Sequence, residues 1–190
     1  MFTVNWFEKT GKKNFEKHLK FFLNEKNLQF LEIGAYEGQS TVWLLENIVV
    51  KTNSTIDVID TFLGSIEHQE IKELDTLKQR FVENISLYKQ YVNIHEGRSQ
   101  DVLCSIHKKF DFIYVDGSHQ ASDVIEDAVL AFRLLKVNGL IAFDDYKWNR
   151  IGDPLQHPQI ALDAFIQLFS NKIEVIEKNY QLFIKKIGDT

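Results

Sequence analysis

The sequence has very little cysteine and proline, and it contains no long apolar run. Cys104 is the only cysteine, so a disulfide framework is excluded. We expect Cys104 to be a small core residue of a helix. No segment approaches the roughly 20 apolar residues that span a bilayer, and the N-terminus lacks an apolar run of signal-peptide length. We therefore expect a soluble, reduced, cytoplasmic protein without a membrane partner.

The chain also lacks an excess of positive charge. Its formal net charge is −5, which disfavours nucleic acid as a partner. The simplest explanation of this negative charge is that it keeps the protein soluble. At 190 residues it is long enough to bury a core as a single domain, and we leave open whether it forms a homo-oligomer. Within that domain we distinguish an N-terminal helical segment (1–27), a core (28–146) and a C-terminal part (147–190).

Short β-rich runs alternate with longer segments of helical periodicity. The predicted strands are Leu28–Ile33, Thr55–Ile59, Tyr91–His95, Phe112–Val115 and Leu140–Phe143. The predicted helices between them are Ser40–Val50, Glu67–Ile85, Ser99–His107 and Ala121–Leu135, the last one ended by Asn138-Gly139. This alternation predicts an α/β, Rossmann-like, doubly wound parallel sheet with helices on both faces.

The C-terminal part follows a different pattern. A helix over Pro158–Phe169 precedes two runs, Lys172–Ile176 and Gln181–Lys186, that a short turn separates. So tight a connection predicts an antiparallel hairpin, which brings the sheet to seven strands. The first segment, Asn5–Asn24, is expected to be a helix packed outside this sheet.

Ligands of open α/β sheets bind beyond the carboxyl ends of the strands, so the residues after each strand are the candidates for function. The first strand runs into "LEIGAYEGQST", where Gly34 and Gly38 allow sharp turns and Ser40 begins a helix whose free N–H groups suit an anion. Such a turn is also common without a ligand. Asp60 follows Gly34 by 26 residues, where an acid either accepts hydrogen bonds from a ribose or caps the next helix.

The third strand leads into "HEGRSQDVL", in which Ser99 is expected to cap a helix. Arg98 or Gln100 faces either a nucleobase or solvent. The fourth and fifth strands end in acids: Asp116 follows "FDFIYV", and Asp144-Asp145 follow "LIAF". Carboxylates that converge at one edge repel one another unless a cation lies among them, and their hard oxygen atoms favour Mg²⁺ or a similar divalent ion. The alternative is that each acid only caps a helix.

Five motifs in this order resemble the class I S-adenosylmethionine-dependent methyltransferases. They are "LEIGAYEGQS", "VIDTF", "EGRSQDVL", "FDFIYVDGSH" and "LLKVNGLIAFDDY", within residues 28–146. More narrowly they resemble the metal-dependent O-methyltransferases of the macrocin, or macrolide-sugar, type and, more distantly, catechol O-methyltransferase. The resemblance implies a cofactor site that comprises Glu32, Gly34, Ala35, Tyr36, Gly38, Ser40, Asp60, Arg98, Ser99, Gln100, Asp116, Gly117 and Ser118. It makes Asp116, Asp144 and Asp145 the metal ligands.

The sequence departs from these families at three positions. Tyr36 replaces a glycine often found in the first loop, and Asp145 stands where catechol-type enzymes have an asparagine. His119 stands where they have a lysine general base, three residues beyond the first metal aspartate. An imidazole, with an ordinary pKa near ~6.5, suits a general base, so we predict His119 as a catalytic residue. We predict Asp116, the first metal aspartate, as the second catalytic residue. The alternative places His119 at a helix start, facing solvent.

The predicted activity is transfer of a methyl group to a hydroxyl of a sugar, a glycan or a small polyol or phenol. The loop 146–160 is expected to lie over the acceptor, where Trp148, Arg150 and His157 either contact a polar ring or merely join two elements. Two other functions stay open. A nicotinamide-dependent oxidoreductase would prefer G-x-G-x-x-G after the first strand, and a silent cofactor-binding module would not need the acids.

Overall fold

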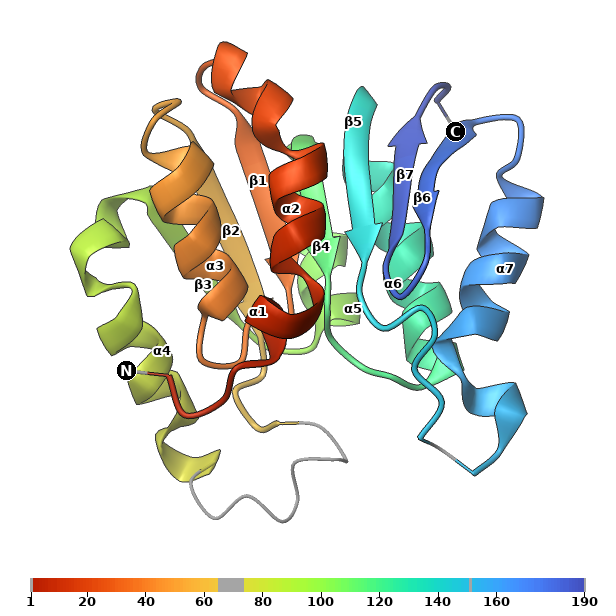
Figure 1. Ribbon diagram of the computed structural model, residues 1–190, viewed down its shortest axis with the longest axis horizontal. Coiled ribbons are helices and arrows are strands. Elements are labelled where there is room, and N and C mark those ends of the chain that lie inside the picture. Colours follow the sequence, from red (N-terminus) through yellow and green to blue (C-terminus); the bar gives the residue numbers. More distant parts are fainter. Residues whose placement is uncertain (1, 65–73, 151, 190) are drawn as a thin grey trace. The chain divides into compact units, whose positions relative to one another are not determined.

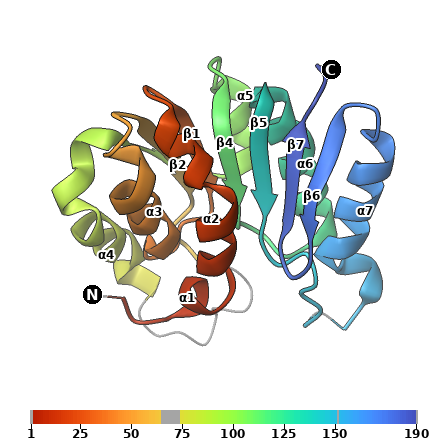
Figure 2. The same ribbon diagram turned by 45° about the horizontal axis from the view of Figure 1, so that its top comes forward.

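The computed structural model describes residues 2–64, 74–150 and 152–189. The chain divides into two units, residues 1–98 and 99–190, each with its own strands and helices (Figure 1, Figure 2). Part of one predicted helix, residues 67–73, lies outside the described residues. No helix among the described residues has the length and apolar character that crossing a membrane requires.

The first unit contains three parallel strands in the order β3-β2-β1. They are β1 (Gln29–Ile33), β2 (Thr55–Asp60) and β3 (Val92–Glu96). β1 and β2 are buried over nearly their whole length, as a parallel strand covered on both faces should be. Their register pairs Glu32 with Val58 and Ile33 with Ile59, so both strands end at the same edge and present the loops that follow them there.

The described helices of the first unit lie before β1 and between successive strands. They are α1 (Trp6–Thr10), α2 (Lys12–His18), η1 (Lys20–Asn24), α3 (Gln39–Leu44), η2 (Leu45–Val49), η4 (Leu74–Thr76), α4 (Leu77–Asn84) and η5 (Ser86–Tyr91). In both views α2 and α3 cover the same face of β1 and β2 (Figure 1, Figure 2). The single N-terminal helix predicted over Asn5–Asn24 is instead three short helices.

The second unit contains four strands in the order β4-β5-β7-β6. β4 (Phe110–Val115) and β5 (Leu135–Phe143) are parallel, whereas β7 (Leu182–Lys186) and β6 (Ile173–Lys178) pair antiparallel, as the short turn between them predicts. The helices are α5 (Ser99–Ser105), α6 (Ala121–Leu134), η6 (Pro154–Gln156) and α7 (Pro158–Leu168). Together the units supply a seven-stranded, mostly parallel sheet with an antiparallel C-terminal pair, which confirms the predicted α/β fold.

One predicted boundary is wrong. Asn138-Gly139 does not end the helix before it, because α6 stops at Leu134 and the next residue already begins β5. Asn138 instead has a positive φ of 70° within the strand, where the register between β4 and β5 shifts. A Cβ on Gly139 would lie 2.9 Å from the carbonyl oxygen of Asp111, so only glycine fits this bulge.

Cys104 also differs from its prediction. Its side chain is exposed on α5, whereas Leu103 beside it is buried. The helical period explains why Leu103 rather than Cys104 faces the core. One position along a helix turns a side chain by about 100°, which here is from the core face toward solvent.

Candidate active site

The loop after β1 forms the centre of the predicted cofactor site in the first unit. Three of its residues have positive φ: Gly34 (80°), Tyr36 (51°) and Gly38 (85°). The chain therefore turns sharply at both glycines, as the sequence predicts. A Cβ on Gly38 would lie 3.0 Å from the ring of Phe81, so close packing as well as conformation selects glycine there.

Asp60, at the end of β2, holds this loop by its backbone. One carboxylate oxygen, Oδ2, accepts the N–H groups of Ala35 at 2.7 Å and Tyr36 at 2.9 Å. The other, Oδ1, accepts the N–H of Phe62 at 2.6 Å. A carboxylate offers about four acceptor positions, so these three bonds leave capacity for one further donor. Asp60 thus orders the loop, and its predicted contact with a ribose stays a prediction.

Glu32, the penultimate residue of β1, has no solvent exposure. The hydroxyl of Ser40 donates to its Oε1, and that of Thr41 donates to its Oε2 at 2.5 Å. Burial raises the pKa of Glu32 to about 7, although the two hydroxyls oppose the rise, and the charge of Asp60 adds to it. The first turn of α3 therefore lies against a buried acid. Near neutral pH both the protonated and the ionised form of this acid are populated.

The N-terminal segment also contacts this loop. Glu37 is buried and accepts both the N–H and the hydroxyl of Thr3, at 2.7 and 2.6 Å. The Nε atom of Arg80 lies 2.8 Å from the same carboxylate. The ring of Trp6 lies 5.1 Å from that of Tyr36. Glu37 occupies an unassigned position of the loop motif, so no sequence signal identified it.

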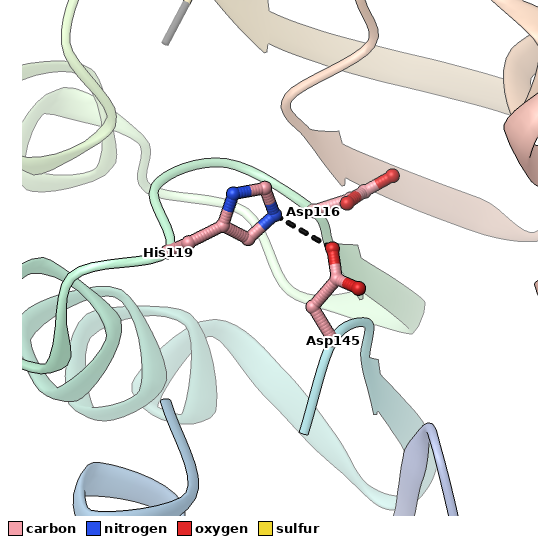
Figure 3. Close-up of side chains that lie close together, drawn as sticks. All are labelled: Asp116, His119 and Asp145. Atoms are coloured by element: carbon pink, nitrogen blue, oxygen red, sulfur yellow. Dashed lines mark ion pairs between the residues drawn. The ribbon is translucent and has the colours of Figure 1, made fainter. Parts of the chain in front are cut away.

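The predicted acids of the second unit gather at the ends of β4 and β5. The register pairs Val115 with Phe143, so the residues that follow, Asp116 and Asp144, begin side by side. Asp116, His119 and Asp145 each bring a potential ligand atom within 4.8 Å of the other two (Figure 3). The Nε2 atom of His119 lies 2.6 Å from Oδ2 of Asp145, and both side chains are about 15% exposed. This cluster, Asp116–His119–Asp145, joins three of the predicted site residues.

Asp144 is placed differently from its neighbour. Its carboxylate accepts the hydroxyl of Tyr114 at 2.6 Å and the backbone N–H of Asp145 at 2.9 Å. Burial first, and the charge of Asp145 next, raise the pKa of Asp144 to about 6. The Tyr114 hydroxyl lies 3.3 Å from Oδ2 of Asp116 as well, so it links the two strand ends.

Tyr114 contacts two of the predicted site residues, and the motifs do not predict it as one of them. A signal for it exists, because side chains two residues apart on a strand point to the same face, and Tyr114 precedes Asp116 by two. A tyrosine in an otherwise apolar buried strand also needs a partner for its hydroxyl.

The remaining predicted residues occupy several places. Gly117 and Ser118 line a small cavity together with Asp116 and His119. Ser99 begins α5, and its hydroxyl donates to the buried Asp127 of α6 at 2.6 Å; Gln100 donates to the same oxygen at 3.4 Å. Arg98 is exposed in the first unit.

Trp148, in the loop that follows β5, contacts the acid cluster. Its indole stacks on the ring of His119, with ring centroids 4.7 Å apart and planes inclined by 20°.

The chain is similar to known methyltransferases. The family model of the methyltransferase domain matches residues 31–146. The O-methyltransferase hkm8 of Aspergillus hancockii is 26% identical over 70% of this chain and 48% of its own length. The chain spans 60% and 48% of the two curated relatives that it matches.

Solved structures share the fold. The O-methyltransferase NovP superposes with a TM-score of 0.72 at 16% identity, over 94% of this chain and 81% of NovP. The mycinamycin-pathway methyltransferase MycE, solved with Mg and S-adenosylhomocysteine, gives a TM-score of 0.65 at 18% identity, over 98% of this chain and 51% of MycE.

Proposed function

Because the chain belongs to the methyltransferase-domain family, we propose that it is an S-adenosylmethionine-dependent O-methyltransferase that requires a divalent metal ion. The observation that carries the metal requirement is the cluster of Asp116, His119 and Asp145, whose ligand atoms lie within 4.8 Å of one another. A dinucleotide oxidoreductase has no use for such a cluster, and a silent binding module gains nothing from it.

The first unit fits the cofactor by its chemistry. The turn at residues 34–38 supplies backbone N–H groups, Asp60 retains acceptor capacity for a ribose hydroxyl, and the buried Glu32 faces the start of α3. The amino-acid end of the cofactor carries an ammonium group, which a carboxylate such as Glu32 attracts. We assign Gly34, Gly38 and Ser40 to this end. We assign the segment 98–100, with Gly117 and Ser118, to the adenine.

The acid cluster fits a divalent ion. Asp116 and Asp145 offer the carboxylate oxygen atoms that Mg²⁺ and Mn²⁺ prefer, and Asp144 adds a third acid beside them. A bound ion would lower the pKa of an acceptor hydroxyl and hold its oxygen in place, as metal ions do for water. The ligand atoms of Asp116 and Asp145 lie together with that of His119, and Asp144 is outside this cluster, so we assign direct ligation first to Asp116 and Asp145.

His119 is assigned as the general base. Its ring takes the proton of the acceptor hydroxyl as the oxygen bonds to the methyl carbon and the bond from that carbon to sulfur breaks. The resulting imidazolium lies beside the carboxylate of Asp145, which stabilises its charge. Trp148 stacks on the ring and limits its rotation. The chain's own contribution is therefore to orient the acceptor and to receive one proton.

The acceptor is proposed to be a hydroxyl of a sugar, a glycan or a small polyol or phenol. Trp148, beside the acid cluster, presents an aromatic ring on which an acceptor ring could pack. MycE, a structural neighbour, was solved with Mg and mycinamycin VI, which supports a small-molecule acceptor.

The decisive experiment measures transfer of a labelled methyl group to a panel of nucleotide sugars, glycans and catechols. On an accepted compound, exhaustive chelation should abolish turnover, and His119→Ala should lower kcat by roughly 10²–10⁴-fold without changing the affinity for S-adenosylmethionine. His107→Ala, at an exposed histidine of the same unit, is the matched control. Full activity after chelation would remove the metal from the proposal. Calorimetric titration with NAD in place of S-adenosylmethionine tests the alternative function. Binding of NAD but not of S-adenosylmethionine would favour an oxidoreductase.

A further inference from the structure

The turn between β6 and β7 approaches the acid cluster from a distant part of the sequence. β7 pairs antiparallel with β5, and the last pair of the register joins Leu182 to Phe143. Continuing this register past the strand ends places Gln181 opposite Asp144 and Tyr180 opposite Asp145. Both views show the β6–β7 turn beside the end of β5 (Figure 1, Figure 2).

The side chain of Tyr180 follows this extended register. Its hydroxyl donates to Oδ1 of Asp145 at 2.5 Å. The turn therefore contacts the second of the two acids that follow β5.

The turn itself is braced, which fixes where the side chain of Tyr180 begins. Asn179 donates its backbone N–H to the carbonyl of Gln181 at 3.0 Å, and its side-chain oxygen accepts the N–H of Gln181 at 2.9 Å. The amide of Asn179 also donates to Glu177 at 2.9 Å. Tyr180 thus projects from a hydrogen-bonded turn rather than from a free loop.

Asp145 is held at both of its carboxylate oxygen atoms. Oδ1 accepts the Tyr180 hydroxyl, and Oδ2 lies 2.6 Å from Nε2 of His119. Rotation of the carboxylate would exchange the two atoms, and the Tyr180 bond opposes that rotation. Its effect is to keep one oxygen directed at the cluster of Asp116, His119 and Asp145.

We propose that Tyr180 is a positioning residue of the active site, which orients the carboxylate of Asp145 for the divalent ion. This inference rests on the metal requirement proposed above. Tyr180 acts on the ion and the acceptor only through Asp145. Partners that orient metal ligands in this way typically change metal affinity by 10–100-fold when they are removed.

The test is Tyr180→Phe, which removes the hydroxyl and keeps the ring. Tyr180 is 39% exposed, so the substitution leaves the core intact. Mn²⁺ is titrated calorimetrically into the cofactor-free protein at a temperature where circular dichroism verifies folding. We expect Mn²⁺ binding to weaken roughly tenfold, with the affinity for S-adenosylmethionine and the melting temperature unchanged. On an identified acceptor, kcat should fall while KM for S-adenosylmethionine stays constant.

Tyr88→Phe is the matched control, because the Tyr88 hydroxyl donates to Glu46 at 3.1 Å in the first unit, where no site residue is involved. Equal Mn²⁺ affinity of the Tyr180→Phe protein and the unaltered protein would overturn the inference and leave the proposed function standing. Equal weakening in both tyrosine variants would overturn it as well. If the unaltered protein binds no Mn²⁺, the metal requirement falls, and the role of Tyr180 falls with it.

Discussion

Glu32 provides a direct test of how burial controls charge in the predicted cofactor site. It is fully buried at the end of β1, and hydroxyl groups of Ser40 and Thr41 donate to its two oxygen atoms. Glu32→Gln keeps the shape of the side chain and removes its ionisation. One hydroxyl can rotate to accept from the new amide group, so both hydrogen bonds survive the change.

The magnitude follows from the raised pKa. Burial brings the pKa of Glu32 from 4.5 to about 7, a difference of about 2.5 units. Each unit corresponds to about 1.36 kcal/mol between the two protonation states, which gives about 3 kcal/mol. The folded state favours the protonated form of Glu32. The contribution of this protonated carboxyl to the free energy of unfolding is therefore fully present below about pH 4.5, and it is lost as the pH rises through about 7.

Urea unfolding of the metal-free and cofactor-free protein measures this contribution. The free energy of unfolding is determined at about pH 5 and about pH 8.5 for the unaltered protein and for Glu32→Gln. The variant should gain about 2.5 kcal/mol relative to the unaltered protein between these two pH values, because only the unaltered protein must ionise a buried acid. Glu46→Gln, at an exposed acid of the same unit, controls for the loss of a charge.

The outcome that would refute this reasoning is a stability difference that does not depend on pH. If the two proteins differ by the same amount at both pH values, Glu32 ionises in the fold as it does in the unfolded chain. Water would then have to reach the carboxylate between β1 and α3, and the argument from burial would be wrong.

Two further substitutions test side chains that each make several polar contacts. Asp60→Asn removes the charge that accepts the N–H groups of Ala35 and Tyr36, so calorimetry should find at least tenfold weaker binding of S-adenosylmethionine; unchanged affinity would exclude Asp60 from the cofactor site. Lys186→Met removes a fully buried ammonium group that donates to the carbonyl of Leu135 at 3.0 Å, so urea unfolding should show a loss of about 2 kcal/mol; a loss below about 0.5 kcal/mol would mean that water replaces the ammonium group.

The strands and the acids at their ends could be predicted because both depend on local sequence. Residues 110–115 are apolar at five of six positions, and Asp116 follows at once, so the sequence indicates the edge of the sheet at which the acids gather. The same is true of Asp144 and Asp145 after β5. Parallel strands bring their carboxyl ends to one edge, so the meeting of Asp116 with Asp145 required no knowledge of the side-chain packing.

The bulge in β5 could not be predicted, because it depends on a neighbour in space. Asn138-Gly139 is equally suited to ending a helix and to turning within a strand, since both need positive φ. The choice is made by β4, whose Asp111 carbonyl approaches too closely for any residue but glycine. The exposure of Cys104 depends likewise on which face of α5 packs inward.

Tyr180 was beyond prediction for a related reason. It follows Asp145 by 35 residues, and only the antiparallel register of β5 and β7 brings the two together. A shift of that register by one residue would exchange the sides of the hairpin and remove the tyrosine from the site. The sequence predicts the hairpin but not its register, and the register decides which side chain reaches which acid.

The same dependence explains how two adjacent aspartates acquire different surroundings. Asp145 has a φ of 54°, a left-handed conformation that costs a non-glycine residue about 1–2 kcal/mol. That conformation turns its carboxylate toward His119, whereas Asp144 before it faces Tyr114. The Tyr180 bond and the hydrogen bond from the N–H of Trp148 to the carbonyl of Asp145, at 2.8 Å, oppose relaxation of the strained residue. The hairpin therefore helps to hold Asp145, two residues beyond the end of β5, in the backbone conformation that places its carboxylate beside His119.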